Sequence, residues 1–169
     1  MQNPKDNLTV FSTTVWDKAH PDVKTFLNGI SVSQQHHHLA HRLERVSMFY
    51  LRNLDRSIPP NHPSRSIGPL CHLFGFASHS IHVAESGKWS FWNQEWNCDS
   101  YEQITAACEP YAGFIDTKIL QVIGDNMISI ATGSKHAIEV GMKDNMLAEY
   151  YQHSLGMGPY TGFFARSVK

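Results

Sequence analysis

The sequence has no excess of charge of either sign. Its 14 lysines and arginines nearly balance its 15 aspartates and glutamates, and charged residues form only 17% of the chain. A protein that binds nucleic acid or an anionic membrane electrostatically needs a basic surface, so neither partner is expected. Apolar residues form 41% of the 169-residue chain, enough for a hydrophobic core, and we expect a single domain over residues 1–169.

Other features are scarce or missing as well. The three cysteines are widely spaced and odd in number, which favours free thiols in the reducing cytoplasm over a disulfide framework. No apolar run approaches the length of a membrane span, and the N-terminus lacks the basic start and apolar core of a secretory signal. There is neither a G-x-G-x-x-G pattern nor a P-loop, so no phosphate-binding loop of these kinds is expected.

The first third of the chain has a helical pattern. An apolar stripe that recurs every three to four residues predicts a long helix, which begins after a capping box at Ser31 and ends before Pro59. A shorter helix is expected from Pro21 to Asn28. Residues 1–56 are therefore the helical part, and residues 57–69, with four prolines, are a loop. The stripe consists of Leu39, Leu43, Val46, Tyr50 and Leu54.

The rest of the chain, residues 70–169, has short apolar runs bounded by turn residues, which predict strands. Two helices are expected among them, over residues 99–112 and 143–155; Asp99 with Glu102 or Ser100 with Gln103 would cap the first. This order of elements predicts an α+β fold in which the N-terminal helical part packs on a mainly antiparallel sheet. The expected strands are 70–76, 80–84, 88–92, 114–123, 127–132, 136–142 and 162–168.

A thiol, a histidine and a carboxylate form the leading candidate site. Cys98 directly precedes the expected helix 99–112, where unpaired backbone N–H groups and the helix dipole favour a thiolate. His136 begins an expected strand and could take the thiol proton, and Asp144 could fix the tautomer of His136. The set predicts a thiol-dependent hydrolase or acyl transferase that acts on a small-molecule or peptide substrate without a cofactor.

The same arrangement resembles the core of papain-like and transglutaminase-like enzymes over residues 97–145. In those families the nucleophile begins a helix and the histidine lies on the sheet that follows. The resemblance implies that Cys98 is the nucleophile, His136 the general base and acid, and Asp144 the orienting carboxylate.

A second candidate site is the histidine cluster at residues 36–41, which holds four of the chain's eleven histidines. On the expected helix, His37, His41 and Glu44 lie on one face at spacings of four and three, which suits two imidazoles and a carboxylate that bind one ion. His72 could complete the set. Nitrogen and oxygen ligands of this kind favour zinc or iron. This alternative predicts a metal-dependent enzyme or a metal-binding protein.

A third alternative needs no catalysis. The segment Lys88–Trp92, together with Trp96, gathers aromatic side chains without a basic run, which is typical of a buried cluster or a partner-binding patch. Histidines at an interface would make such a contact sensitive to pH. This alternative predicts an interaction or assembly protein, such as a homo-oligomer. The sequence leaves all three alternatives open.

Overall fold

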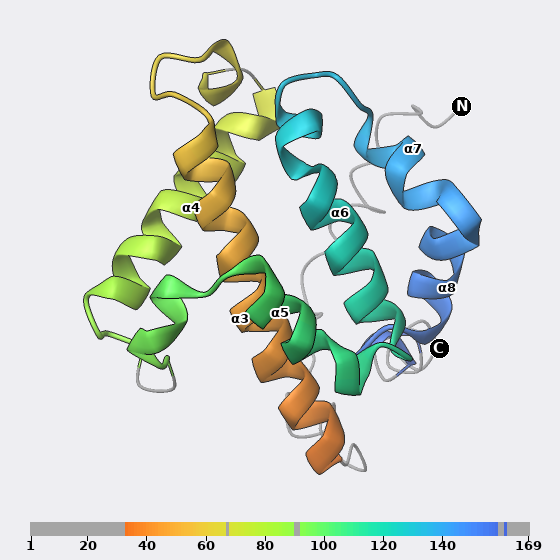
Figure 1. Cartoon of the computed structure of the whole chain (residues 1–169). Coiled ribbons are helices and arrows are strands. Elements are labelled where there is room, and N and C mark those ends of the chain that lie inside the picture. Colours follow the sequence, from red (N-terminus) through yellow and green to blue (C-terminus); the bar gives the residue numbers. More distant parts are fainter. Residues whose placement is uncertain (1–32, 67, 90–91, 159–160, 162–169) are drawn as a thin grey trace, which may run out of the picture. The chain divides into compact units, whose positions relative to one another are not determined.

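The computed structural model describes residues 33–66, 68–89, 92–158 and 161, and no strand occurs among them (Figure 1). Residues Val32–Gly158 form one compact unit. The expected helix 21–28 and the expected strand 162–168 lie outside the described residues. The helices are α3 (Gln34–Ser57), α4 (Gly68–Glu85), α5 (Tyr101–Cys108), α6 (Ile115–Ala131), α7 (Ala137–Met142) and α8 (Met146–His153). Short 3₁₀ segments are η1 (Pro63–Arg65), η2 (Gln94–Cys98), η3 (Glu109–Tyr111) and η4 (Lys143–Asn145).

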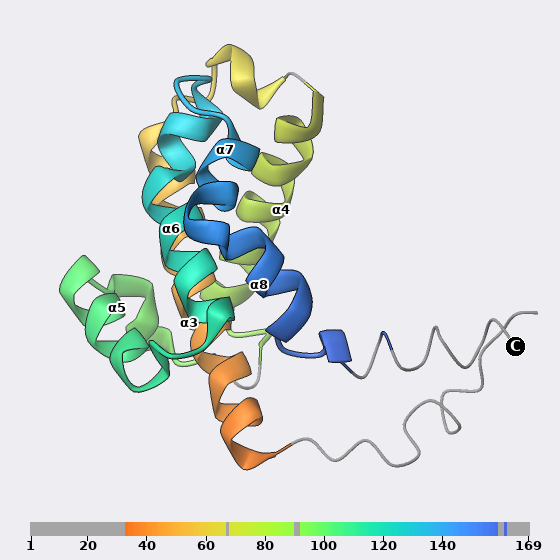
Figure 2. The ribbon, with the colours of Figure 1, turned by 90° about the vertical axis from the view of Figure 1, so that its right-hand side faces the viewer.

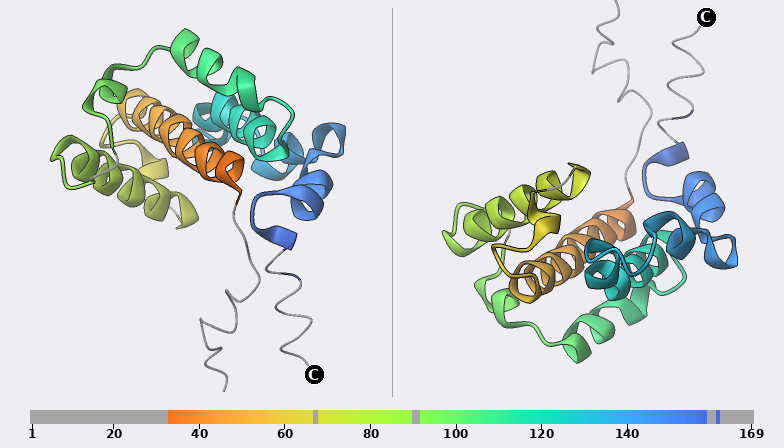
Figure 3. Two further views of the ribbon diagram at one scale, coloured as in Figure 1. Left: turned by 90° about the horizontal axis from the view of Figure 1, so that it is seen from below. Right: turned by 90° about the horizontal axis from the view of Figure 1, so that it is seen from above.

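Helix α3 is central to this unit. It packs against α4 on one side and against α6 on the other, and α7 and α8 lie beyond α6 (Figures 1 and 3). Helix α5 covers α3 and α6 on a further side (Figure 2). Apolar clusters fill the space on both flanks of α3, so this helix contributes to all of them. None of the described helices combines the length and the hydrophobicity needed to cross a membrane.

The long helix expected from the apolar stripe is confirmed as α3. Ser33 is its N-cap, two residues after the expected Ser31, and the Ser33 hydroxyl accepts a hydrogen bond from the His36 N–H at 3.1 Å. Four of the five stripe residues are buried, and Leu43 is half-buried. Residues outside the stripe, among them Phe49 and Leu51, are buried too, because neighbours cover α3 on more than one side.

The predicted α+β fold is wrong, and α4 illustrates the reason. The expected strands 70–76 and 80–84 both belong to this helix. Its buried residues are separated by three, three and four positions, which is a helical period. Two of them are alanines and one is a serine, so the apolar runs alone resembled two short strands. The four buried residues are Phe74, Ala77, Ser80 and Ala84.

Helix α6 contains two more of the expected strands, 114–123 and 127–132, and the residues between them, which begin with Gly124, continue the helix. The inward-facing positions Leu120, Gly124, Met127 and Ala131 follow spacings of four, three and four. Because the glycine leaves a gap in this stripe, the sequence pattern indicates two short apolar runs instead of one helix. The expected strand 136–142 is α7, and the described residues of 88–92 lie in neither a helix nor a strand.

The two helices expected in the second part are confirmed with different ends. Ser100 and Gln103 form the capping box of α5, and α8 is the helix expected over residues 143–155. Both carboxylate oxygens of the buried Asp116 accept a hydrogen bond from the Leu155 N–H at 3.0 Å. This contact ties the chain just after α8 to the first turn of α6.

Candidate functional site

The structure does not bring the predicted catalytic residues together. Cys98 is exposed at the end of η2, which packs on α3 and α4. His136 is the N-cap residue of α7, which packs on α6 and α8. Figures 1 and 3 show α3 and α6 between η2 and α7. Asp144 lies in η4, in a left-handed backbone conformation at φ 54°.

The histidine cluster has the geometry expected of α3 but holds no metal site. The rings of His37 and His41 stack with centroids 5.1 Å apart, and His41 Nδ1 lies 3.4 Å from Glu44 Oε2. His72 is an exposed residue of α4. Among the residues that the structure describes, no three histidine, cysteine or acidic side chains are placed to hold an ion. The expectation of a zinc or iron site is therefore wrong for this part of the chain.

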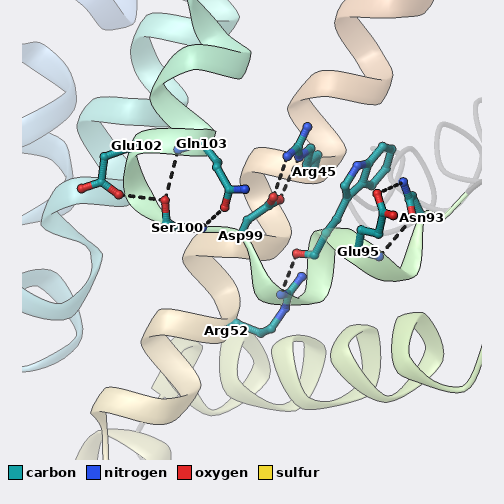
Figure 4. A network of polar contacts seen from close by, with 9 residues as sticks. Arg45, Arg52, Asn93, Glu95, Asp99, Ser100, Glu102 and Gln103 are labelled. Carbon is teal, nitrogen blue, oxygen red and sulfur yellow. Dashed lines mark hydrogen bonds and ion pairs between the residues drawn. The ribbon is translucent and has the colours of Figure 1, made fainter.

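Two charged side chains join α3 to the chain between η2 and α5 (Figure 4). Arg45 donates to both carboxylate oxygens of Asp99, from Nε at 2.7 Å and from Nη2 at 2.5 Å. The Asp99 side chain is only 3% exposed and that of Arg45 15%. The hydrogen bond to Asp99 raises the pKa of the Arg45 guanidinium, against the opposing effect of burial. The sequence suggested Asp99 only as a helix cap, because its partner lies 54 positions away.

Trp96 is held in place by several neighbours. The Arg45 guanidinium carbon lies 5.3 Å from the centroid of the Trp96 ring, and the Trp92 ring meets it edge-on at 5.1 Å and 88°. The buried Arg52 donates from Nη1 to the Trp96 carbonyl at 2.9 Å (Figure 4). Two arginines of α3 therefore fix the position of one tryptophan of η2.

A cavity of about 250 Å³ lies beside this tryptophan. Its lining residues come from α3, η2 and η3, and they combine part of the histidine cluster with part of the aromatic segment. The sequence marked both features separately, but nothing in their spacing indicated that they face each other. The lining residues are His38, His41, Arg42, Trp96 and Tyr111. We call this hollow the Trp96 cavity.

A second surface feature lies on α7 and α8. Ile138, Met142 and Tyr151 are 69%, 62% and 61% exposed, although apolar side chains of this size are usually covered. A hollow of about 270 Å³ between these helices is lined by Met142, Asn145, Leu147, Ala148 and Tyr151. We call these five residues together with Ile138 the α7–α8 surface.

Comparisons with known proteins find similarity between this chain and short regions of large synthases. It is 35% identical over 169 residues to the polyketide synthase-nonribosomal peptide synthetase TwmB of Talaromyces wortmannii. The match covers 99% of this chain and 6% of that protein. This chain is similar to a short region of such synthases. The polyketide synthase-nonribosomal peptide synthetase pyiS of Pyricularia grisea is 32% identical over 165 residues, which cover 96% of this chain and 4% of pyiS.

One relative lacks a peptide synthetase in its name. The highly reducing polyketide synthase calA of Penicillium decumbens is 28% identical over 152 residues, which cover 90% of this chain and 5% of calA. The chain therefore spans only a small part of each of these relatives. No protein-family model matches it, and no solved structure matches it.

These findings correct the predicted function. The relatives are regions of synthases, and the described part of the chain is helical where the thiol-enzyme resemblance requires a sheet. The interpretation as a thiol-dependent hydrolase with Cys98, His136 and Asp144 is therefore wrong. The motifs that resemble papain-like and transglutaminase-like enzymes are short, and they lie on elements that the structure keeps apart.

Proposed function

We propose that this chain is a helical region of a polyketide synthase and serves as a docking element within that larger protein. The observation that carries the proposal is the coverage of the match to TwmB, which extends over 99% of this chain and 6% of the relative. The match to calA, named as a polyketide synthase alone, supports placing the region in the polyketide synthase part of the hybrid proteins.

The α7–α8 surface is the proposed docking contact. Exposed apolar patches on protein surfaces mark interaction sites, and five of the six residues of this one line a hollow. Its partner would be another region of the same synthase that presents apolar side chains. The hydrogen bonds from Leu155 to Asp116 support this role, because they hold the end of α8 in place before any partner binds.

The proposal leaves any catalytic activity to other parts of the synthase. It also keeps the expectation of a reducing compartment, which the free state of Cys71, Cys98 and Cys108 supports. A homo-oligomer stays a prediction.

The proposal can be tested by replacing the matching region of TwmB with this chain. Residues 1–169 would replace the matching region of TwmB, and the polyketide product of the host would be measured by mass spectrometry. We expect the chimera to keep the product and a deletion of the region to lose it. Ile138→Asp combined with Met142→Asp should lower the product at least about tenfold, because both side chains lie in the proposed contact.

The matched control is Phe76→Asp. It replaces an apolar side chain of α4, which is 59% exposed, with the same charged residue. This variant should leave the product unchanged. Circular dichroism of the isolated chain should show equal helix content in all variants, since each substituted side chain is exposed. A deletion that keeps the product, or a control that loses it to the same degree, would contradict the proposal.

A further inference from the structure

We propose that the Trp96 cavity binds a small organic phosphate that carries an aromatic ring, of which a nucleoside monophosphate is the simplest example. The cavity is separate from the α7–α8 surface, since its walls come from α3, η2 and η3. The inference therefore goes beyond the proposed docking function and does not depend on it. Its volume of about 250 Å³ suits one compact ligand.

One wall of the cavity supplies hydrogen-bond donors. His38, His41 and Arg42 are separated by three and four positions and share one face of α3. Arg42 is exposed, and it takes part in none of the ion pairs among the described residues. A guanidinium stays charged at all ordinary pH values and its fork of donors matches a phosphate. Arg42 is therefore the principal anion-binding group.

Two carboxylates lie close to the cavity, and each has a partner among the described residues. Glu44 lies beside His41, with 3.4 Å between its Oε2 and the histidine Nδ1. Asp99 is occupied by the two hydrogen bonds from Arg45. A phosphate monoester offers three terminal oxygens to the donors of α3, whereas a carboxylate offers only two. The donor set therefore fits a phosphate better than a carboxylate.

The opposite side of the cavity is aromatic. Trp96 and Tyr111 approach from different segments, η2 and η3. Trp96 is already fixed by Arg45, Arg52 and Trp92, so its ring loses little freedom when a ligand stacks on it. Flat heterocyclic rings stack on aromatic side chains of this kind, whichever base the ring belongs to. The side chains of the cavity would bind the phosphate, a role that belongs to a glycine-rich loop in other proteins and that the sequence has no such loop to fill.

Titration of the full chain with AMP, adenosine and inorganic phosphate tests the inference. The readout is the set of tryptophan indole N–H signals in ¹H–¹⁵N NMR spectra, with the Trp96 signal identified from a Trp96→Phe variant. We expect AMP to shift the Trp96 signal in a saturable way, and adenosine and phosphate to bind at least about tenfold more weakly. Arg42→Gln should weaken AMP about tenfold, the loss of one charge-assisted hydrogen bond, and leave adenosine unchanged.

The matched control is Arg56→Gln, an exposed arginine of the same helix that lies roughly 21 Å from Arg42 along the α3 axis. AMP affinity should be unchanged in this variant. Three results would overturn the inference: no shift of the Trp96 signal with about 10 mM AMP, equal affinity for AMP and adenosine, or equal losses of AMP affinity in the two variants. Displacement of AMP by a glutamate-rich peptide of higher affinity would also overturn it, and would assign the cavity to an acidic protein segment.

Discussion

Gly124 of α6 lies directly against the aromatic ring of Tyr50 in α3. A Cβ atom on Gly124 would stand 2.4 Å from two carbons of that ring, closer than side-chain carbons pack. The Tyr50 hydroxyl continues past the glycine and donates to Asp125 at 2.7 Å. The close approach of α3 and α6 therefore depends on the missing side chain at position 124.

Gly124→Ala should destabilise the protein by about 2 kcal/mol, because the added methyl group has to displace the Tyr50 ring or part the two helices. Urea unfolding followed by circular dichroism measures this change. Gly75→Ala in α4 is the matched control, since no atom lies within 4 Å of its Cβ position. This control should stabilise the protein by about 0.5–1 kcal/mol through helix propensity. Equal effects of the two substitutions would contradict the steric explanation.

The Tyr50 hydroxyl gives the fold a pH dependence in the alkaline range. Burial and the hydrogen bond to Asp125 raise the pKa of Tyr50, and the charge of Asp125 raises that of Tyr101. A tyrosine with a higher pKa in the folded state stabilises the fold below its unfolded pKa of about 10. This contribution is lost as the pH rises above that value toward the folded pKa.

The free energy of unfolding should therefore fall from about pH 10 upward, by up to about 1.4 kcal/mol per pH unit for Tyr50. Tyr50→Phe should reduce this slope and cost about 1 kcal/mol at pH 7 for the lost hydrogen bond. Tyr151→Phe, at an exposed position, is the control and should keep the parent slope. Denaturant unfolding at several pH values checks the prediction, which fails if both variants keep the slope.

The ion pair of Arg45 with Asp99 makes a second contribution that can be measured. Asp99→Asn should cost about 3 kcal/mol, because it leaves the half-buried Arg45 guanidinium without its carboxylate. In a double-mutant cycle with Arg45→Met, we expect a coupling energy of about 1–3 kcal/mol. Glu95→Gln, on the exposed side of η2, is the control and should change stability by less than about 0.5 kcal/mol. Additive effects of the two substitutions would show that the pair contributes no coupling.

The sequence predicted the long helix α3 and the last helix correctly, and one of its two suggested caps for α5 is the capping box observed, because each has a strong local pattern. It failed at α4 and α6, where small residues face inward. Gly124, Ala77 and Ala84 leave gaps in an apolar stripe, so one helix was interpreted as two strands separated by a turn. The role of these small residues in helix packing can be recognised only when the position of the neighbouring helix is known.

The Trp96 cavity could be predicted only in part. The histidine cluster and the aromatic segment were both noticed in the sequence, but as separate features. The ion pair of Arg45 with Asp99 is one of the contacts that join these segments, and no local pattern connects residues 54 positions apart. Tyr111 gave no signal of its own, because a single tyrosine after a short helix has no periodic context.

Arg52 offers the closest comparison with Arg45, since both arginines extend from α3 toward Trp96. Arg52 is only 4% exposed, and its Nε and Nη2 atoms have no hydrogen-bond partner. Burial, followed by the charge of Arg56, lowers the pKa of its guanidinium. The single hydrogen bond to the Trp96 carbonyl therefore compensates little of the cost of burying this charge.

Arg52→Met should accordingly leave the free energy of unfolding within about 1 kcal/mol of the parent value, or raise it. Methionine keeps most of the buried stem and removes the unpaired donors, at the cost of one hydrogen bond. Arg45→Met, measured in the same urea titration, should be the more destabilising of the two by about 2 kcal/mol, because it leaves the nearly buried Asp99 unpaired. If Arg52→Met proves as costly as Arg45→Met, the hydrogen bond to Trp96 must hold η2 on α3 more strongly than its geometry suggests.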